Sequence, residues 1–292
     1  MITNSTEMLD KARKEHYAVP AFNVNNLEWA RAILEAAEEA KSPVIIQATS
    51  GAANYMGSFR LVYDLIVDMY HALNITVPVS IHLDHGTFYD AIKTLGIKFT
   101  SIMFDGSALP LDENLDKTKT LVKLAHAEDV SVEAEVGTIG GEEDGVIADG
   151  EIAPVDSAVK MAETGVDMLA VGIGNIHGKY PKDWKGLNFD HLKKIDQAIY
   201  NQTGKQLPLV LHGGSGIPDD QIRKAIQLGI SKINVNTEGQ LAFHQAMRDY
   251  VHSDKDLEGK NYDPRIFLKA GTNALKEMCL DRIKVFGSEN KA

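Results

Sequence analysis

The sequence predicts an α/β protein: a single (β/α)8 TIM barrel over residues 1–292, with an additional helix at the C-terminal end. Two observations support this prediction. Short, apolar and β-branched segments recur eight times along the chain, and amphipathic segments with helical spacing lie between them. The chain has 292 residues with a hydrophobic content of 44%, which suffices for one large barrel. An open, doubly wound sheet is the alternative, but no G-x-G-x-x-G motif follows the first predicted strand.

The predicted strands are short runs of apolar and β-branched residues, the pattern of buried strands. They are residues 18–24, 43–50, 77–85, 100–106, 131–137, 168–174, 207–214 and 232–238. The clearest helices between them are residues 27–40, 115–128 and 219–229, where apolar residues recur at helical spacing. Residues 262–292 are expected to add helix after the eighth unit.

Composition and charge exclude several classes of partner. With Lys+Arg 30 against Asp+Glu 41, the formal net charge is -11, and the basic residues are scattered along the chain. This argues against nucleic acid or an anionic membrane as the main partner. The single cysteine, Cys279, has no partner for an internal disulfide, and neither a signal peptide nor a membrane-spanning run is visible. We therefore expect a cytoplasmic protein.

Ionisable and polar side chains gather at the carboxyl ends of the predicted strands, where the active sites of this fold lie. They are Asp84, His85, Asp105, Glu133, Glu135, His177, His212, Asn234 and Asn236. Asp84 and His85 are adjacent in the sequence, and neighbours on a regular strand point to opposite faces. We therefore expect the third strand to end or distort at this point, so that both side chains reach the mouth of the barrel.

Three histidines are candidates for a metal site, namely His85, His177 and His212. One such histidine alone would more often be packed or solvated, but three on one rim favour a metal. Three imidazoles with one open coordination position are typical of catalytic zinc. Asp105 and Glu135 either form a second, more oxygen-rich cation site or accept a histidine N–H, and the sequence leaves both roles open. His82, one step deeper in its strand, is expected to be packed or to support a ligand.

A glycine-rich turn predicts an anion site beside His212. The segment HGGSG at residues 212–216 is followed by Pro218 and a helix, and such a turn presents backbone N–H groups to an anion. In this fold phosphate commonly binds between the loops after the seventh and eighth strands, and NVNT at residues 234–237 supplies the second loop. The expected ligand carries a phosphate close to a metal-binding group, as a phosphorylated sugar does.

The segment GTIGGEEDGVIADGE, residues 137–151, is glycine-rich and acidic. A solvated loop explains this composition. Because the segment starts beside Glu135, with Gly140 and Gly141 as possible hinges, a lid that brings Glu142 or Glu143 over a substrate is the alternative.

These motifs, in this order, resemble one family over nearly the whole chain. The strings HLDHG, VEAEVGTIGGEEDG, GNIHGKY, LHGGSGIP, KINVNTE and YDPRIFLKAG are similar to those of the class II, zinc-dependent fructose-bisphosphate aldolases and the related tagatose-bisphosphate aldolases. The resemblance implies reversible cleavage of a ketohexose 1,6-bisphosphate to dihydroxyacetone phosphate and glyceraldehyde 3-phosphate. It also implies a catalytic Zn²⁺, and it allows a second divalent or monovalent cation.

The resemblance also implies residue roles. The zinc ligands would be His85, His177 and His212, with Asp105 and Glu135 around an alternative metal position. Dihydroxyacetone phosphate would contact Gly178, Gly213, Gly214, Ser215, Asn234, Val235, Asn236 and Thr237. Asp84 would protonate the aldehyde oxygen, and Glu143 would move a proton at the reacting carbon. Arg265 would reach the second phosphate from a neighbouring subunit, which implies at least a homodimer. Thr49 and Ser50 either contact the glyceraldehyde phosphate or cap the next helix.

Several alternatives stay open. Asn236 occupies a position that is aspartate in many fructose-specific members and alanine in the tagatose type, although the short lid and the C-terminal sequence favour the fructose type. A Schiff-base aldolase would need a lysine at a strand's carboxyl end, and neither Lys179 nor Lys232 is well placed for this role. A hydrolase-type zinc site lacks its H-x-H pair after the first strand. A non-catalytic barrel that binds phosphosugars is the remaining possibility.

Overall fold

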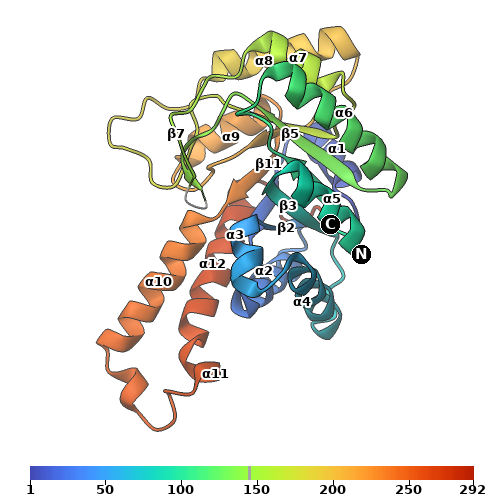
Figure 1. Cartoon of the computed structure of the whole chain (residues 1–292). Helices are drawn as coiled ribbons and strands as arrows, with labels where there is room; N and C mark the ends of the chain where they lie inside the picture. Colours follow the sequence, from blue (N-terminus) through green and yellow to red (C-terminus); the bar gives the residue numbers. More distant parts are fainter. Residues whose placement is uncertain (144–145) are drawn as a thin grey trace.

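A computed structural model describes residues 1–143 and 146–292, without the side chains of residues 143 and 146–148. Parallel strands close into a barrel in the order β1-β11-β10-β8-β5-β4-β3-β2, surrounded by helices (Figure 1). The barrel strands are β1 Val19–Asn23, β2 Val44–Ala48, β3 Val79–Gly86, β4 Ser101–Phe104, β5 Ser131–Val136, β8 Met168–Val171, β10 Leu209–Leu211 and β11 Ile230–Val235. The predicted TIM barrel is confirmed, and the pairing of β1 with both β2 and β11 excludes the open sheet.

The helices follow the predicted alternation with strands. They are α1 Thr6–Glu15, α2 Leu27–Glu39, α3 Ser50–Met56, α4 Phe59–Ala72, α5 Phe88–Ile97, α6 Leu111–Ala127, α7 Val155–Ala162, α8 Phe189–Thr203, α9 Asp219–Gln227, α10 Thr237–His252, α11 Pro264–Phe267 and α12 Lys269–Val285, with a 3-10 turn at Lys255–Leu257. Within the described ranges, none of them is long and apolar enough to cross a membrane. The predicted C-terminal helix is present as α12, which lies against α10 in an arm that extends away from the barrel (Figure 1).

The barrel interior changes from apolar to charged along its axis. At the amino ends of the strands, α1 contributes Met8 and Leu9 to an apolar cluster that includes Val19 and Ile45. Further along the strands the interior side chains are polar or charged, and many of them are fully buried. Polar groups buried away from water need partners, so the polar side chains in the carboxyl-end half of the barrel are expected to bond one another or a ligand. This half is therefore where the functional site is expected.

A second, small sheet stands beside the barrel mouth. Its strands are β6 Gly140–Glu143, β7 Val146–Ala148 and β9 Ile176–His177, in the order β7-β6-β9. The segment predicted as a loop or lid is therefore largely a hairpin. Gly140 and Gly141 lie within β6 and pair with Ile176 and His177 rather than standing at a free hinge.

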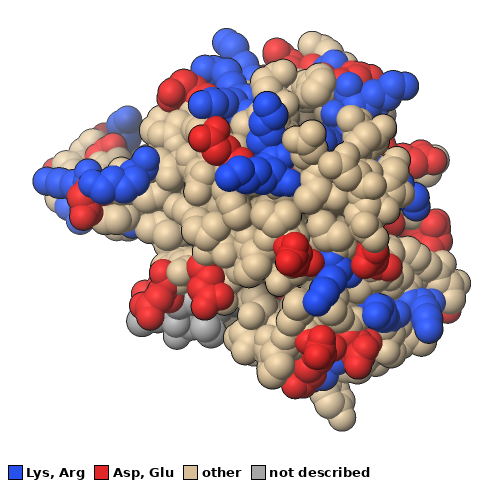
Figure 2. Space-filling view, turned by 90° about the horizontal axis from the view of Figure 1, so that it is seen from above, with Lys and Arg blue, Asp and Glu red and all other residues tan. Residues whose placement is uncertain are grey.

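Acidic and basic side chains both occur across the face of the molecule seen in Figure 2. This agrees with the scattered charge of the sequence, in which no basic stripe is present. Binding to the phosphate backbone of a nucleic acid would require such a stripe.

Candidate active site

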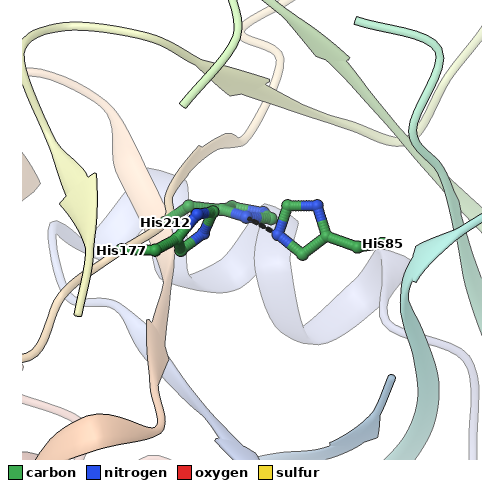
Figure 3. A group of neighbouring side chains, drawn as sticks. All are labelled: His85, His177 and His212. Atoms are coloured by element: carbon green, nitrogen blue, oxygen red, sulfur yellow. Dashed lines mark hydrogen bonds between the residues drawn. The ribbon is translucent and has the colours of Figure 1, made fainter. Parts of the chain in front are cut away.

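Three imidazoles converge at the barrel mouth. One ring nitrogen from each of His85, His177 and His212 lies within 4.8 Å of those of the other two (Figure 3). The His85 ring is 4.9 Å from that of His177 and 4.6 Å from that of His212, measured between ring centroids. The expected distortion of the third strand is also present. His85 has a φ of 48°, and the β3–β4 register shifts between Leu83 and Gly86.

The hydrogen bonds around these rings leave nitrogen lone pairs facing each other. His85 Nδ1 lies 2.8 Å from Asp105 Oδ2, and His212 Nε2 lies 2.8 Å from Glu133 Oε1. Carboxylates accept, so each of these ring nitrogens carries the hydrogen. The remaining nitrogens, His85 Nε2 and His212 Nδ1, are 2.8 Å apart. Two neutral rings would repel each other there, and a shared cation removes the repulsion.

The electrostatics of the cluster favour a positive charge at this point. Burial alone would lower the pKa of His85, but Asp84, Asp105 and Glu135 outweigh it and raise the pKa to about 10. Burial, followed by the proximity of His85 and His212, lowers the pKa of His177 to about 3. The carboxylates thus stabilise one cation among the three rings, and the donor set of three imidazoles suits zinc.

Asp105 and Glu135 differ in their contacts. Together with His85 they form a second group whose possible ligand atoms lie within 4.8 Å of one another. Asp105 bonds His85, so it can fix the tautomer of that ring. Among the described residues, the buried Glu135 Oε2 has no hydrogen-bond partner. Burial and the nearby Asp105 raise the pKa of Glu135 to about 8. A cation beside this oxygen would give it a ligand role.

Asp84 is held by three amide side chains. Its Oδ2 accepts from Asn23 Nδ2 at 2.9 Å and from Gln47 Nε2 at 3.0 Å, and its Oδ1 accepts from Asn234 Nδ2 at 3.2 Å. Burial alone would raise the pKa of Asp84, but the neighbouring His85, His212 and Lys232 hold it below its usual value. Asn23 and Gln47 were not among the predicted site residues. Each is a polar residue in the last two positions of one of the first two apolar strands, which was the available signal.

The predicted phosphate residues line a small cavity beside His177. Its lining includes Gly178, Gly213, Ser215, Asn234, Asn236 and Thr237. Ser215 Oγ accepts from the Glu238 amide at 3.1 Å, which leaves its hydroxyl hydrogen available to a ligand. Gly213 has a φ of 62°, and a Cβ there would clash with the Ile176 carbonyl. Glycine is required at this close approach of two chain segments.

Gly214, after β10, and Val235, at the end of β11, make contacts within the protein. The Gly214 amide donates to the Asn234 carbonyl at 2.9 Å, so that amide is already used. The Val235 side chain is buried in the hydrophobic core.

A larger cavity of about 490 Å³ is lined by His85 and His177. Ser50 lines it and donates to Asp90 Oδ2 at 3.1 Å. Thr49 is buried, and its Oγ1 accepts from the Ala52 amide as the N-cap of α3. Of the two roles left open for these residues, Thr49 fits the cap and Ser50 borders the space for a substrate.

Of three further candidates, Arg265 and Lys232 line neither of these two cavities, and the third is Glu143. Arg265 is on α11, where its side chain is 88% exposed and pairs with Asp263 at 2.6 Å, and it lines neither cavity. The side chain of Glu143 lies outside the described residues. Lys232 is fully buried in β11 and pairs with Glu133 at 2.7 Å, so it has no open access to a substrate carbonyl.

Comparison with known proteins agrees with this geometry. A family model described as fructose-bisphosphate aldolase class-II matches residues 3–291. A fructose-bisphosphate aldolase of Streptococcus pyogenes serotype M3 is 53% identical, over 100% of this chain and 99% of that protein. The fructose-bisphosphate aldolase of Mycoplasma pneumoniae is 50% identical over the full length of both chains.

Solved structures show the same relationship. The YdjI aldolase from Escherichia coli K12 superposes with a TM-score of 0.83 at 34% identity and covers 100% of both chains. A putative fructose-1,6-biphosphate aldolase from Coccidioides immitis has a TM-score of 0.87 at 29% identity, covering 99% of this chain and 98% of that one. The chain therefore belongs to the class-II fructose-bisphosphate aldolase family.

Proposed function

We propose that this chain catalyses the reversible, zinc-dependent aldol cleavage of fructose 1,6-bisphosphate to dihydroxyacetone phosphate and glyceraldehyde 3-phosphate. The observation that carries the proposal is the group of three histidine nitrogens within 4.8 Å of one another, next to a glycine-lined cavity. The names of relatives that are 50–53% identical along the whole chain support fructose over tagatose as the sugar.

In this proposal His85, His177 and His212 hold the zinc ion. Zinc supplies a Lewis acid for the carbonyl and hydroxyl oxygens of the substrate, where negative charge develops as the carbon–carbon bond breaks. The second cation position around Asp105 and Glu135 is retained in the proposal, because the buried Glu135 Oε2 has no hydrogen-bond partner within the described part of the chain.

Asp84 moves the proton of the aldehyde oxygen. In the cleavage direction it takes the proton from the substrate hydroxyl as the bond breaks, and in the synthesis direction it returns it. The three amides that bond Asp84 orient its carboxylate. Glu143 is the proposed acid/base at the carbon that is cleaved, carried by the hairpin that pairs with the His177 strand.

The two proposed halves of the substrate would lie in the two cavities that His177 lines. The phosphate of dihydroxyacetone phosphate would bind at Gly178, Gly213 and Ser215, where glycines allow the backbone to approach an anion. The glyceraldehyde portion would extend into the 490 Å³ cavity bordered by Ser50.

Chelation followed by reconstitution tests the proposal. Removal of metal from the purified protein is expected to abolish cleavage of fructose 1,6-bisphosphate, and added Zn²⁺ is expected to restore it. The kcat/KM values of the reconstituted enzyme for fructose and tagatose 1,6-bisphosphate measure the preference between the C4 epimers, and we expect the fructose epimer to be preferred.

Each contrary outcome identifies a different alternative. Full activity after thorough chelation, together with borohydride trapping of an adduct, would indicate a Schiff-base enzyme. A reconstituted protein that binds the sugar phosphates without turnover would indicate a non-catalytic barrel. A preference for the tagatose epimer would reassign the substrate.

We further propose that the active form is at least a homodimer in which Arg265 reaches the second phosphate of the partner's substrate. Within one chain, Arg265 lines neither cavity. The arm that carries it exposes Leu257 and Tyr262, with exposures of 76% and 71%. A bidentate guanidinium suits a phosphate, and loss of a hydrogen bond to a charged group costs about 1.5–3 kcal/mol.

A complementation experiment separates a shared site from a site within one chain. Arg265→Ala and Asp84→Asn are each expected to lower activity strongly as homodimers. Refolding the two variants together should recover about a quarter of the wild-type activity, because half of the randomly paired dimers carry one intact site. No recovery, with mixed dimers present, would place the action of Arg265 within its own chain.

A further inference from the structure

A buried set of charged and polar groups lies one layer below the histidine cluster. Lys232, Glu133 and His82 each have 0% exposure. They lie on β11, β5 and β3, two residues before Asn234, Glu135 and Asp84 on the same strands. Since side chains two residues apart on a strand share a face, these three groups point into the barrel beneath the site. None of them has a part in the proposed chemistry.

Lys232 and Glu133 both lie close to Nε2 of His82. Lys232 Nζ lies 2.7 Å from Glu133 Oε2 and 3.5 Å from His82 Nε2. An ammonium group only donates, so toward Lys232 the His82 Nε2 atom accepts, and the hydrogen of His82 is then on Nδ1, 2.7 Å from Ser101 Oγ. Toward Glu133 Oε2, at 3.4 Å, the same Nε2 would have to donate. Lys232 and Glu133 thus favour opposite tautomers of His82.

Glu133 also contacts His212, one of the proposed zinc ligands. Glu133 accepts from Lys232 through Oε2 and, through Oε1, from His212 Nε2 at 2.8 Å. The hydrogen of His212 is therefore on Nε2, and the lone pair of Nδ1 points toward His85. Ligand histidines commonly need such a partner on the second nitrogen to fix the tautomer and the ring orientation.

Lys232 is what holds Glu133 in this arrangement. The lysine compensates the charge of a fully buried carboxylate and is bonded to its Oε2. Its Nζ forms a triangle with Glu133 Oε2 and His82 Nε2, and this His82 nitrogen is 3.4 Å from the same oxygen. Without the lysine, His82 could adopt its other tautomer and bond Glu133 directly, and the carboxylate would be free to turn away from His212.

We propose that Lys232 is a positioning residue for the metal site: through Glu133 it fixes the tautomer and orientation of His212, and so sets the affinity of the site for zinc. The inference rests on the proposed zinc-dependent function. Loss of a group that orients a metal ligand typically weakens metal affinity about 10–100-fold, and an effect of this size is expected for the removal of Lys232.

Zinc titration of the full-length protein, stripped of metal, tests this inference. Lys232→Met removes the charge while nearly keeping the volume, and Lys98→Met is the control because that lysine is 69% exposed. Competition against a chromophoric chelator gives the zinc Kd of each variant, and the visible spectrum of the Co²⁺-loaded protein reports the ligand geometry. We expect a Kd about 10–100-fold higher and a changed Co²⁺ spectrum for Lys232→Met alone.

A double-mutant cycle shows whether the effect passes through Glu133. If it does, Lys232→Met combined with Glu133→Gln should weaken zinc binding no more than Glu133→Gln alone, because coupled residues are not additive. If Lys232→Met does not fold, Lys232→Gln, which keeps a donor without the charge, takes its place in every comparison.

Unchanged zinc affinity and an unchanged Co²⁺ spectrum, with only a lower unfolding temperature, would make Lys232 a structural residue and overturn the inference. Additive losses in the cycle would overturn the route through Glu133. Because these readouts are metal affinity and ligand geometry, they remain valid even if the wild-type protein proves unable to cleave fructose 1,6-bisphosphate, the result that would reject the proposed function.

Discussion

Asp84→Asn is expected to lower kcat for cleavage of fructose 1,6-bisphosphate by about 10²–10⁴-fold, the usual contribution of a positioned acid or base. The pKa of Asp84 is held below its usual value, so the free enzyme carries a carboxylate that is ready to accept the substrate's hydroxyl proton. An amide of the same shape cannot do this. Steady-state kinetics combined with a zinc assay of the same sample measure the effect, and the zinc content is expected to stay at the wild-type level.

The surroundings of Asp84 make this substitution tolerable to the fold. Asn234 donates to Asp84 Oδ1 through Nδ2, while the buried Asn234 Oδ1 has no hydrogen-bond partner among the described residues. A flip of the Asn234 amide would therefore present an acceptor to the new NH₂ group, and Asn23 and Gln47 could still donate to the remaining oxygen. The flip also turns Asn234 Nδ2 to the side where Oδ1 has no partner. The substitution therefore removes the proton transfer and leaves one buried donor unpaired, at a cost of about 1–3 kcal/mol.

Asp116→Asn, an exposed substitution of the same chemistry on α6, is the matched control and should leave kcat unchanged. A kcat for Asp84→Asn within about tenfold of the wild type would remove Asp84 from the role of acid or base, since the expected loss starts at about 10².

The fold could be predicted from local patterns, because the hydrophobic periodicity of each strand or helix is visible within one short segment. The spacing of these segments along the chain then indicates the alternation of strands and helices. The eight apolar runs match the eight barrel strands within a few residues, and α2 and α9 begin at the predicted positions. The start of α6 was missed by four residues, at Leu111 rather than 115. Pro110 is the N-cap of α6. The first turn of the helix is mostly polar, so it lacks the helical spacing of apolar residues on which the prediction relied.

The histidine cluster was predictable for a related reason. Once the barrel was inferred, the carboxyl ends of all strands met at one rim, and His85, His177 and His212 each lay at or after the end of a predicted strand. The small sheet was not predictable in this way. The hairpin of β6 and β7 pairs with β9, and the availability of that strand edge depends on how the chain leaves β8.

The buried contacts of Lys232 and Glu133 below His212 could not be predicted from the sequence. Glu133 was noted at the strand end, but its partner Lys232 lies on β11, and β8 and β10 stand between that strand and β5. Contact between them runs across the closed interior rather than along the sheet. Only the closure of the barrel, and the choice of which strand face turns inward, places the lysine on the glutamate and the glutamate on His212.

His212→Ala is expected to weaken zinc binding by more than about 100-fold, because the loss of a group that merely orients a ligand already costs about 10–100-fold. The zinc Kd of the metal-free protein measures this directly. A second readout is thermal: a ligand at about 100 times its Kd stabilises the folded state by about 2.7 kcal/mol. Added zinc should therefore raise the Tm of the wild type and have little effect on the variant.

The variant should nevertheless fold, because the buried charge of Glu133 keeps its partner. Removal of the imidazole takes away one donor to Glu133 Oε1, while Lys232 still bonds Oε2 at 2.7 Å. Breaking a buried pair would be strongly destabilising, but here the ion pair survives the substitution. His244→Ala, at an exposed position on α10, controls for the loss of an imidazole. A His212→Ala protein that binds zinc as tightly as the wild type would show that the metal, if bound, is held without this residue.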